Sequence, residues 1–268
     1  MMRKYLWLVL AIVPVVVAAQ RPATTPRVAD PDDPPATFSI LGFDPETGEV
    51  GGAVASRVFS VGNGVLWAEA GVGAVATQAQ VDVSYGPQGL ALLEQGVAPA
   101  EVIKRILAAD PDPGLNGRPW PKGGRQFAVM NAKGELAAHT GPTASVWAGD
   151  KQGKFCTAQG NILTGPDVVA KMVEAFESSE VAADGRRNRL AVRLLMALEA
   201  GQAAGGDKRG KQSAAMLIVK KNGGVWLNND VVARLQVDDH ADPIAELRRL
   251  VELSPAGRSG RGGRGGPS

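Results

Sequence analysis

The sequence predicts an α+β fold in which antiparallel sheets pack face to face, with a pair of helices on each outer side. Three observations lead to this fold class. The predicted elements follow the order strands, two helices, strands, two helices, strands, whereas a doubly wound parallel sheet alternates strand and helix. The predicted strands are mostly apolar and rich in small residues, which is typical of sheets buried on both faces. Gly- and Pro-containing runs with turn chemistry separate several of them.

Short apolar runs predict the strands, and the first two form a hairpin. Residues 44–49, with Pro45 and Gly48, supply the tight turn that joins them. The predicted strands are 38–43, 50–56, 65–69, 72–78, 126–131, 135–139, 146–147, 155–161, 213–220, 224–228 and 231–237.

Apolar residues at helical spacing predict the helices. A proline suited to the first helical turn opens two of them, at Pro87 and Pro99. The predicted helices are 87–95, 99–109, 166–178, 189–203 and 242–251. In the last one, Asp242 is the expected N-cap and Pro243 the first helical residue. We expect it to dock on the core or to begin a small appendage.

Residues 1–19 have the pattern of a secretory signal. A basic start at Arg3 and Lys4 precedes an apolar run, and small residues follow at 17–19. That run is shorter than the roughly 20 apolar residues that a membrane-spanning helix needs. The sequence therefore predicts export, to the periplasm or beyond the cell, without stable membrane insertion after cleavage. Residues 20–36 are rich in Pro, Thr and Asp, which is the composition of an extended linker.

Composition narrows the class of protein. Without the signal, roughly 250 residues remain, enough for one sizeable core. The domain is expected at 37–240, followed by a helix at 241–253 and a disordered Gly/Arg tail at 254–268. Formal charge over the whole chain is +2, and Arg3 and Lys4 leave with the signal. The balance of charge gives no reason to expect a nucleic-acid partner.

The few cysteines and histidines limit the chemistry. Cys156 is the single cysteine, so no internal disulfide is expected, and we interpret it as a buried small side chain rather than a nucleophile. His139 and His240 are the only histidines, and no carboxylate cluster has metal-ligand spacing. We expect no metal and no cofactor.

Several segments, taken in order, resemble the family called domain of unknown function 1028. They are residues 37–40, 53–57, 71–78, 85–90, 125–126, 139–141, 159–161 and 205–215. Each is weak alone, but their number and order make the resemblance specific. It implies membership of the N-terminal nucleophile (Ntn) hydrolase superfamily and a four-layer αββα sandwich, which agrees with the fold class predicted above. The family's substrate is not established.

The resemblance implies a role for Thr37. In that superfamily the first residue of the mature chain attacks an amide carbonyl, and its own α-amine takes the proton. An α-amine has a pKa near 8 and so serves as a base at neutral pH. This chain departs from that pattern, because a signal and a linker precede Thr37. A second cut at Ala36–Thr37 is needed; without it, Thr37 is an ordinary strand residue.

Other polar residues at strand ends and in loops are candidates, each with a structural alternative. Asn161 is a candidate oxyanion donor or a turn residue, and Gln78, next to Thr77, is another candidate donor or a structural one. Arg57 is suited to a substrate carboxylate or is a solvated charge. The candidates for substrate binding are Arg57, Thr77, Gln78, Tyr85, His139, Asp207 and Arg209. For Asp207 we slightly favour a structural pair with a nearby arginine.

The leading functional hypothesis is hydrolysis of a linear amide or peptide bond by Thr37 and Asn161. The alternative is a binding or structural protein that keeps the sandwich without catalysis. A small-molecule or peptide amide is the expected partner in the first case. The sequence leaves the substrate and the oligomeric state open, a homo-oligomer included.

Overall fold

The computed structural model describes residues 37–257. The predicted signal (1–19), the linker (20–36) and residues 258–268 of the predicted tail lie outside the described residues. No helix within residues 37–257 is long and apolar enough to cross a membrane.

The larger sheet has six strands in the order β10-β9-β2-β1-β8-β7, all neighbours antiparallel. Its strands are β1 (Thr37–Asp44), β2 (Glu49–Ser56), β7 (Gly149–Gly153), β8 (Cys156–Asn161), β9 (Ser213–Val219) and β10 (Val231–Val237). The predicted hairpin of β1 and β2 is confirmed, and β1 occupies an interior position between β2 and β8. Every residue of β1 is buried, as the apolar run predicted.

The smaller sheet has four strands in the order β3-β4-β5-β6, again antiparallel. They are β3 (Leu66–Glu69), β4 (Gly73–Ala79), β5 (Arg125–Asn131) and β6 (Leu136–Thr140). This sheet packs against the larger one, with β3 and β4 against β2, and β5 and β6 against β8.

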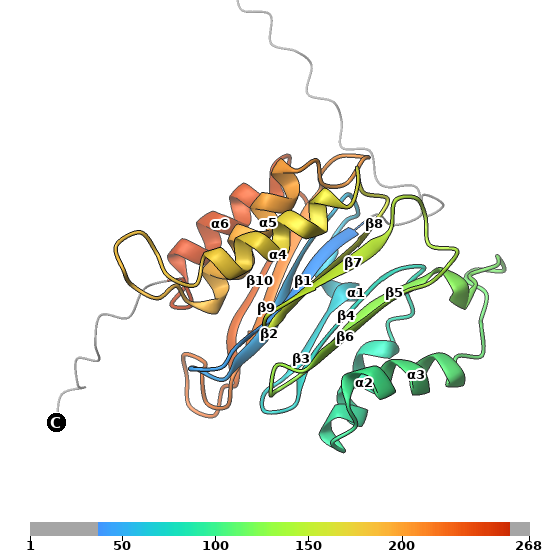
Figure 1. The fold of residues 1–268 in the computed structure, drawn as a ribbon, viewed down its shortest axis with the longest axis horizontal. Helices are drawn as coiled ribbons and strands as arrows, with labels where there is room; N and C mark the ends of the chain where they lie inside the picture. Colours follow the sequence, from blue (N-terminus) through green and yellow to red (C-terminus); the bar gives the residue numbers. More distant parts are fainter. Residues whose placement is uncertain (1–36, 258–268) are drawn as a thin grey trace, which may run out of the picture.

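The helices cover the two outer faces, so that the layers are helix, sheet, sheet, helix (Figure 1). The larger sheet is covered by α4 (Asp167–Ser178), α5 (Leu190–Ala203) and α6 (Pro243–Leu253). The smaller sheet is covered by α2 (Tyr85–Glu94) and α3 (Pro99–Ala109). A one-turn helix, α1 (Gly62–Val65), and a 3-10 turn at Lys122–Gly124 complete the described helices.

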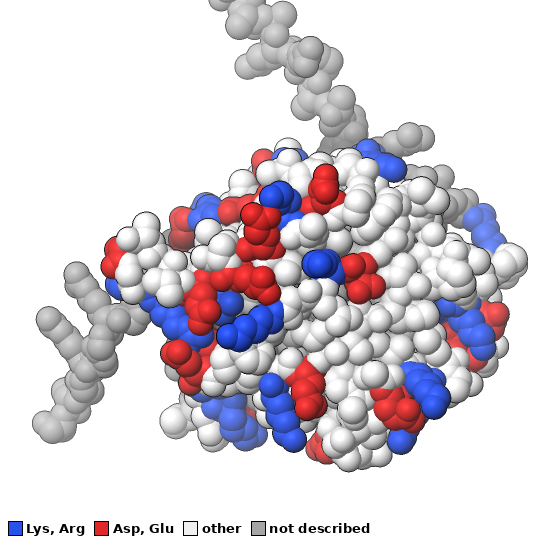
Figure 2. Space-filling view, in the orientation of Figure 1, with Lys and Arg blue, Asp and Glu red and all other residues white. Residues whose placement is uncertain are grey.

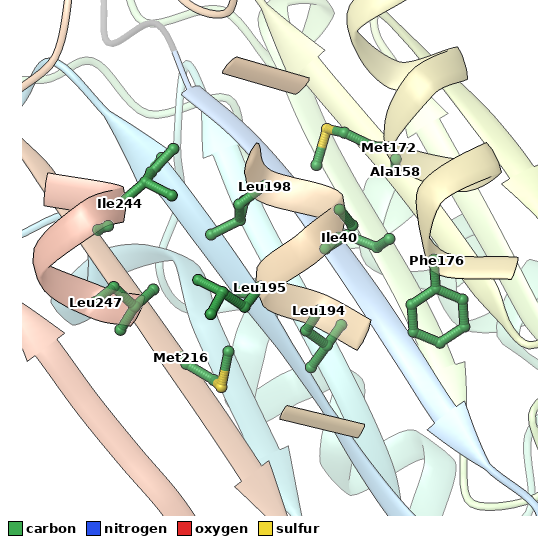
Figure 3. Close-up of a cluster of buried hydrophobic side chains, with 14 of the residues drawn as sticks. Ile40, Ala158, Met172, Phe176, Leu194, Leu195, Leu198, Met216, Ile244 and Leu247 are labelled. Atoms are coloured by element: carbon green, nitrogen blue, oxygen red, sulfur yellow. The ribbon is translucent and has the colours of Figure 1, made fainter. Parts of the chain in front are cut away.

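Three apolar clusters fill the spaces between these layers. The largest lies between the six-stranded sheet and its helices, where Leu194, Leu195 and Leu198 of α5 face Ile40 of β1 and Met216 of β9 (Figure 3). A second cluster fills the space between the sheets, and a third lies under α2 and α3. The helix α6 belongs to the first cluster through Ile244, Leu247 and Val251, so it docks on the core. Its predicted cap is confirmed, because the Asp242 carboxylate accepts a hydrogen bond from the Ala245 amide.

Two predicted strands are wrong. Residues 224–228 form bends and a turn between β9 and β10, and Trp226 and Leu227 are exposed there. Residues 146–147 lie before the actual strand β7, whose sequence Gly-Asp-Lys-Gln-Gly has no apolar residue. The strand β7 is an edge strand that pairs only with β8 and exposes its middle residues, so it needs no apolar pattern.

Charges of both signs are mixed on one face of the molecule. On the face seen in Figure 2, Lys and Arg side chains lie next to Asp and Glu side chains, and a wide area of this face carries no charged side chain. That face has no large patch of one sign.

Replacing one buried leucine tests how strongly α5 depends on this core. Leu195 is 1% exposed, whereas its neighbour Met196 is 36% exposed. We expect Leu195→Ala to lower the free energy of unfolding by about 2–5 kcal/mol, because it leaves a cavity, and Met196→Ala to change it by less than about 1 kcal/mol. Urea denaturation of both variants measures the difference. Equal losses would contradict this packing.

Candidate active site

Four polar residues form one row across the larger sheet, at the end where β1 begins. The register places Asn161 of β8 opposite Thr37, Thr37 opposite Ser56 of β2, and Ser56 opposite Ser213 of β9. The pattern follows from antiparallel pairing, because the starts of β1 and β9 meet the ends of β2 and β8. Residues directly opposite each other have Cβ atoms about 4.5–5.5 Å apart. The sheet therefore brings the two predicted catalytic residues, Thr37 and Asn161, side by side.

The Thr37 side chain points into the space between the two sheets. Alternation along β1 puts Thr37 and Ser39 on the same face as Leu41 and Phe43, which belong to the inter-sheet cluster. The Thr37 hydroxyl donates a hydrogen bond to the Ser56 hydroxyl at 3.2 Å. The residue is 2% exposed.

A buried network of amide side chains lies directly behind Thr37. Gln78 of β4 donates to the Thr37 carbonyl at 3.3 Å and to the Gln126 side-chain oxygen at 2.8 Å. Its own side-chain oxygen accepts from the Ser39 hydroxyl at 2.5 Å, and Gln159 of β8 donates to the same hydroxyl at 2.6 Å. Gln78 is thus committed to holding the β1 backbone, and it links the two sheets.

Gln126 of β5 extends this network to the far side of the site. Its amide donates to the Thr140 hydroxyl at 2.9 Å and to the Gly160 carbonyl at 2.9 Å. The network therefore joins β1, β4, β5, β6 and β8 at one end of the sandwich. Buried polar groups of this kind specify a unique arrangement when each has a partner.

A small pocket opens beside Thr37. It has a volume of about 160 Å³ and includes Thr37, Thr77 and Gln78 among its walls. The Thr77 hydroxyl donates to the Gly64 carbonyl at 2.6 Å and accepts from the Trp67 indole at 3.2 Å, so it fixes α1 at the pocket wall. Ser213 anchors the opposite wall, because its hydroxyl donates to the Val58 carbonyl at 2.5 Å and accepts from the Val61 amide at 3.1 Å.

The loop 205–210 closes the same end of the larger sheet through Asp207. The Asp207 carboxylate accepts from the Arg57 amide at 3.2 Å and from the Arg209 amide at 2.8 Å. It also forms an ion pair with the Arg209 guanidinium at 3.0 Å. Asp207 therefore shapes the loop, as the structural interpretation predicted. Arg57 is half-buried, and its side chain passes close to Gly210.

Tyr85 lies apart from Thr37, in the layer between the smaller sheet and α2 and α3. Its ring packs on Phe127, and its hydroxyl donates a short hydrogen bond to Asp110, which also pairs with Arg125 at 3.1 Å. Burial, followed by the bond to Asp110, raises the pKa of Tyr85. Burial also raises the pKa of Asp110, but the bonds from Tyr85 and the Asp112 amide, together with the charge of Arg125, outweigh it and lower that pKa overall.

His139 lies on the opposite face of the smaller sheet from the site. It stands opposite Phe127 on β5, with ring centroids 5.8 Å apart, and Phe127 belongs to the cluster under α2 and α3. Burial lowers the pKa of His139, although the nearby Asp150 charge works the other way. The structure therefore does not bring His139 to Thr37.

Cys156 is buried, as the sequence predicted. Burial and the nearby Glu177 charge raise the pKa of its thiol to about 12, so it stays protonated at neutral pH. Within residues 37–257, no three His, Cys, Asp or Glu side chains gather in a way that could hold a metal ion.

Comparison with known proteins decides the family. A model of the family of unknown function DUF1028 matches residues 37–247, most of the chain. The chain belongs to the DUF1028 family. The crystal structure of protein SPO2555 from Silicibacter pomeroyi, also matched to DUF1028, is similar at 32% sequence identity and a TM-score of 0.67. The similarity covers 81% of this chain and 88% of that one. No curated protein matches the sequence.

The DUF1028 site contains residues that the sequence did not single out. Ser56, Gln126, Gln159 and Ser213 all contact Thr37 directly or support its surroundings. Their common signal is a polar residue in an otherwise apolar strand run, at positions that alternation turns toward the other sheet. The strand order and register that bring them together are not visible in the sequence.

Breaking the Asp110–Arg125 pair tests the layer that holds Tyr85. We expect Asp110→Asn to lower the free energy of unfolding at pH 7 by about 3–5 kcal/mol, because Arg125 is left buried without its counter-charge. The folded-state pKa of Asp110 is lowered, so its contribution is present above pH ~4 and is lost as the pH falls further. Urea unfolding at pH 7 and pH 3 measures this.

The matched control is Glu69→Gln, which removes an exposed carboxylate at the edge strand β3. It should change stability little at either pH. The loss in the free energy of unfolding caused by Asp110→Asn should be smaller at pH 3 than at pH 7. An equal loss at both pH values would contradict the assigned charge state of Asp110.

The amide network makes a second prediction. Gln78→Met keeps the size of the side chain but removes the acceptor of the Ser39 hydroxyl proton and the donor to the Gln126 side-chain oxygen. We expect a loss of about 1–3 kcal/mol in the free energy of unfolding for each group left unpaired. The control is Gln88→Met on the exposed face of α2, which should be near neutral. Thermal or urea unfolding compares the two, and equal effects would show that the network contributes nothing.

Proposed function

We propose that this DUF1028 protein is an exported hydrolase of the Ntn type, in which Thr37 cleaves a linear amide bond. The observation that carries the proposal is the position of Thr37. It begins an interior strand, faces the space between two sheets, and borders a pocket. The layer order helix, sheet, sheet, helix supports assignment to the Ntn-hydrolase sandwich, and the family match begins at the same residue.

The reaction requires Thr37 as the N-terminal residue. Its hydroxyl oxygen attacks the carbonyl carbon of the amide, and the hydroxyl proton passes to the α-amine of Thr37. The amine then gives that proton to the leaving nitrogen as the C–N bond breaks, and an ester to Thr37 remains. Water, activated by the same amine, hydrolyses the ester and restores the threonine.

The neighbouring residues have distinct roles in this proposal. Asn161, opposite Thr37, is the donor we assign to the oxyanion that forms on the substrate carbonyl. Gln78 is a positioning residue, since it binds the Thr37 carbonyl rather than the substrate. Arg57 stands next to Ser56 at the same end and is suited to a carboxylate of the substrate.

Export and a second cleavage complete the proposal. Removal of the signal-like residues 1–19 leaves Gln20 at the N-terminus, and Thr37 becomes free only when the Ala36–Thr37 bond is cut. Either the protein itself or a separate protease makes this cut.

Intact mass and N-terminal sequencing of the exported protein test this directly. We expect a chain that starts at Thr37. Thr37→Ala should abolish amide hydrolysis, at least a 10³-fold loss in rate, because the nucleophile is removed. Thr37→Ser should keep measurable activity, since it retains both hydroxyl and amine.

The opposite result supports the rival function. In the described structure the Thr37 hydroxyl already has Ser56 as its partner and the residue is almost fully buried. If folded exported protein starts at Gln20, and Thr37→Ala has no effect on any activity found, the chain is a binding or structural protein that keeps the sandwich without catalysis.

A further inference from the structure

The pocket beside Thr37 has the chemistry of a binding site for one apolar side chain. Resting on the function proposed above, we infer that it selects substrates with an aliphatic or aromatic side chain on the acyl side of the cleaved amide. The acyl group is the part that becomes bonded to the Thr37 oxygen. Its side chain must therefore stay close to Thr37 during both chemical steps, while the amine departs.

Besides the uncharged polar residues Thr37, Ser60, Thr77 and Gln78, the walls of the pocket are apolar. Val58 and Val61 come from the loop after β2, Val65 from α1, and Ala79 and Val81 from the end of β4 and the turn after it. None of the lining residues, all of which belong to the described part of the chain, carries a charge. A charged substrate side chain would lose its hydration there without gaining a partner, which disfavours acidic and basic groups.

The volume of the pocket limits the size of its ligand. At about 160 Å³ it is close to the cavity of about 150 Å³ that accepts a benzene molecule in an engineered protein core. A single leucine, isoleucine or phenylalanine side chain therefore fits, whereas a nucleotide does not. Most ligand pockets are larger, about 300–1,000 Å³, so the rest of the substrate lies outside this pocket.

Exposed apolar side chains lie at the entrance of the pocket. Phe59, in the pocket wall, is 63% exposed, and Val83, which is 48% exposed, lies beside Gly64 of the wall. Folding alone does not stabilise such exposure. An apolar ligand that covers Phe59 and Val83 would remove their surface from water, and this burial would favour binding.

The backbone of the pocket is strained at two positions. Ser60 and Ala79 both line the pocket, and both have positive φ, at 54° and 65°. Residues other than glycine adopt this region rarely, and such strain clusters at binding and active sites. The Ser60 hydroxyl donates a hydrogen bond to the Asp238 carboxylate at 2.5 Å. This bond holds the part of the pocket wall around Ser60 in one conformation.

Binding measurements on an inactive protein test this subsite separately from catalysis. The form that begins at residue 37 keeps all three apolar clusters, which consist only of described residues. In that form and in the full chain, Thr37→Ala would be titrated with N-acetyl-leucinamide, N-acetyl-glycinamide and N-acetyl-aspartamide by calorimetry or NMR. We expect the leucine compound to bind at least tenfold more tightly than the other two in the form that begins at residue 37.

Two substitutions in the pocket and one outside it sharpen the test. Gly64→Val adds a side chain to the pocket wall, and only Val83 lies within 4 Å of the new Cβ, so the fold has room for it. We expect this larger wall residue to narrow the pocket and remove the preference for leucine. Phe59→Ser replaces an exposed residue and should weaken leucine binding several-fold without unfolding the protein. The control Leu227→Ser changes a residue that is 95% exposed in the loop at the other end of β9, and should leave binding unchanged.

The outcomes separate the subsite from the reaction. Equal binding of the three compounds, or a leucine preference that survives Gly64→Val, would overturn the subsite. Preferred binding of leucine together with no hydrolysis of N-acetyl-leucine anilide by the Thr37 form would keep the subsite and reject the proposed reaction. Hydrolysis that is fastest for the leucine anilide and slow for the aspartate one would support both.

Discussion

The contact between the two sheets at the Thr37 end determines how the rest of the site is arranged. Apolar packing between sheets is not directional, and it tolerates small sliding movements. Gln78 removes that freedom, because it reaches from β4 to the Thr37 carbonyl and the Ser39 hydroxyl of β1. Gln126 does the same toward β8 through the Gly160 carbonyl. Burying these amides without hydrogen-bond partners would cost free energy. A shift of one sheet against the other would break their bonds, so the relative position of the sheets is coupled to the position of Thr37.

The two ends of the space between the sheets therefore differ in polarity. In the second half of β1 the inward face is apolar at Leu41 and Phe43, and toward the start of the strand it is polar at Ser39 and Thr37. The same change occurs on the inward faces of β2, β4 and β5, which end in Ser56, Gln78 and Gln126 at this edge. The inward face of β8 is polar throughout, at Thr157, Gln159 and Asn161. A buried polar edge of this kind adds little to stability. Its value lies in the fixed geometry that it imposes on the side chains around Thr37.

Most of the fold was predictable, because helix and strand periods are local properties of the chain. The apolar strands β1, β2, β4 and β8 were recognised, whereas the polar edge strand β7 was not, and the apolar residues 224–228 proved to be an exposed turn. The site was only half predictable. Thr37 and Asn161 come together through register, and His139 points away because it is out of phase with Thr140 by one residue. Register and strand order depend on long-range pairing, which no local pattern records.

The proposed reaction of Thr37 needs a base, and the contacts of the described residues limit which group can serve. His139 lies on the other face of the smaller sheet, and the nitrogen Nδ1 of His240 accepts a bond from the Asp242 amide. Asp110 is paired with Arg125, and Asp207 with Arg209. These two histidines and two aspartates, all within residues 37–257, therefore do not serve as the base for Thr37. The hydroxyl of Ser56 is not a base at neutral pH. The remaining proton acceptor next to the Thr37 oxygen is its own nitrogen, and that nitrogen accepts a proton only as a free amine. The proposed catalysis by Thr37 therefore requires cleavage of the chain before Thr37.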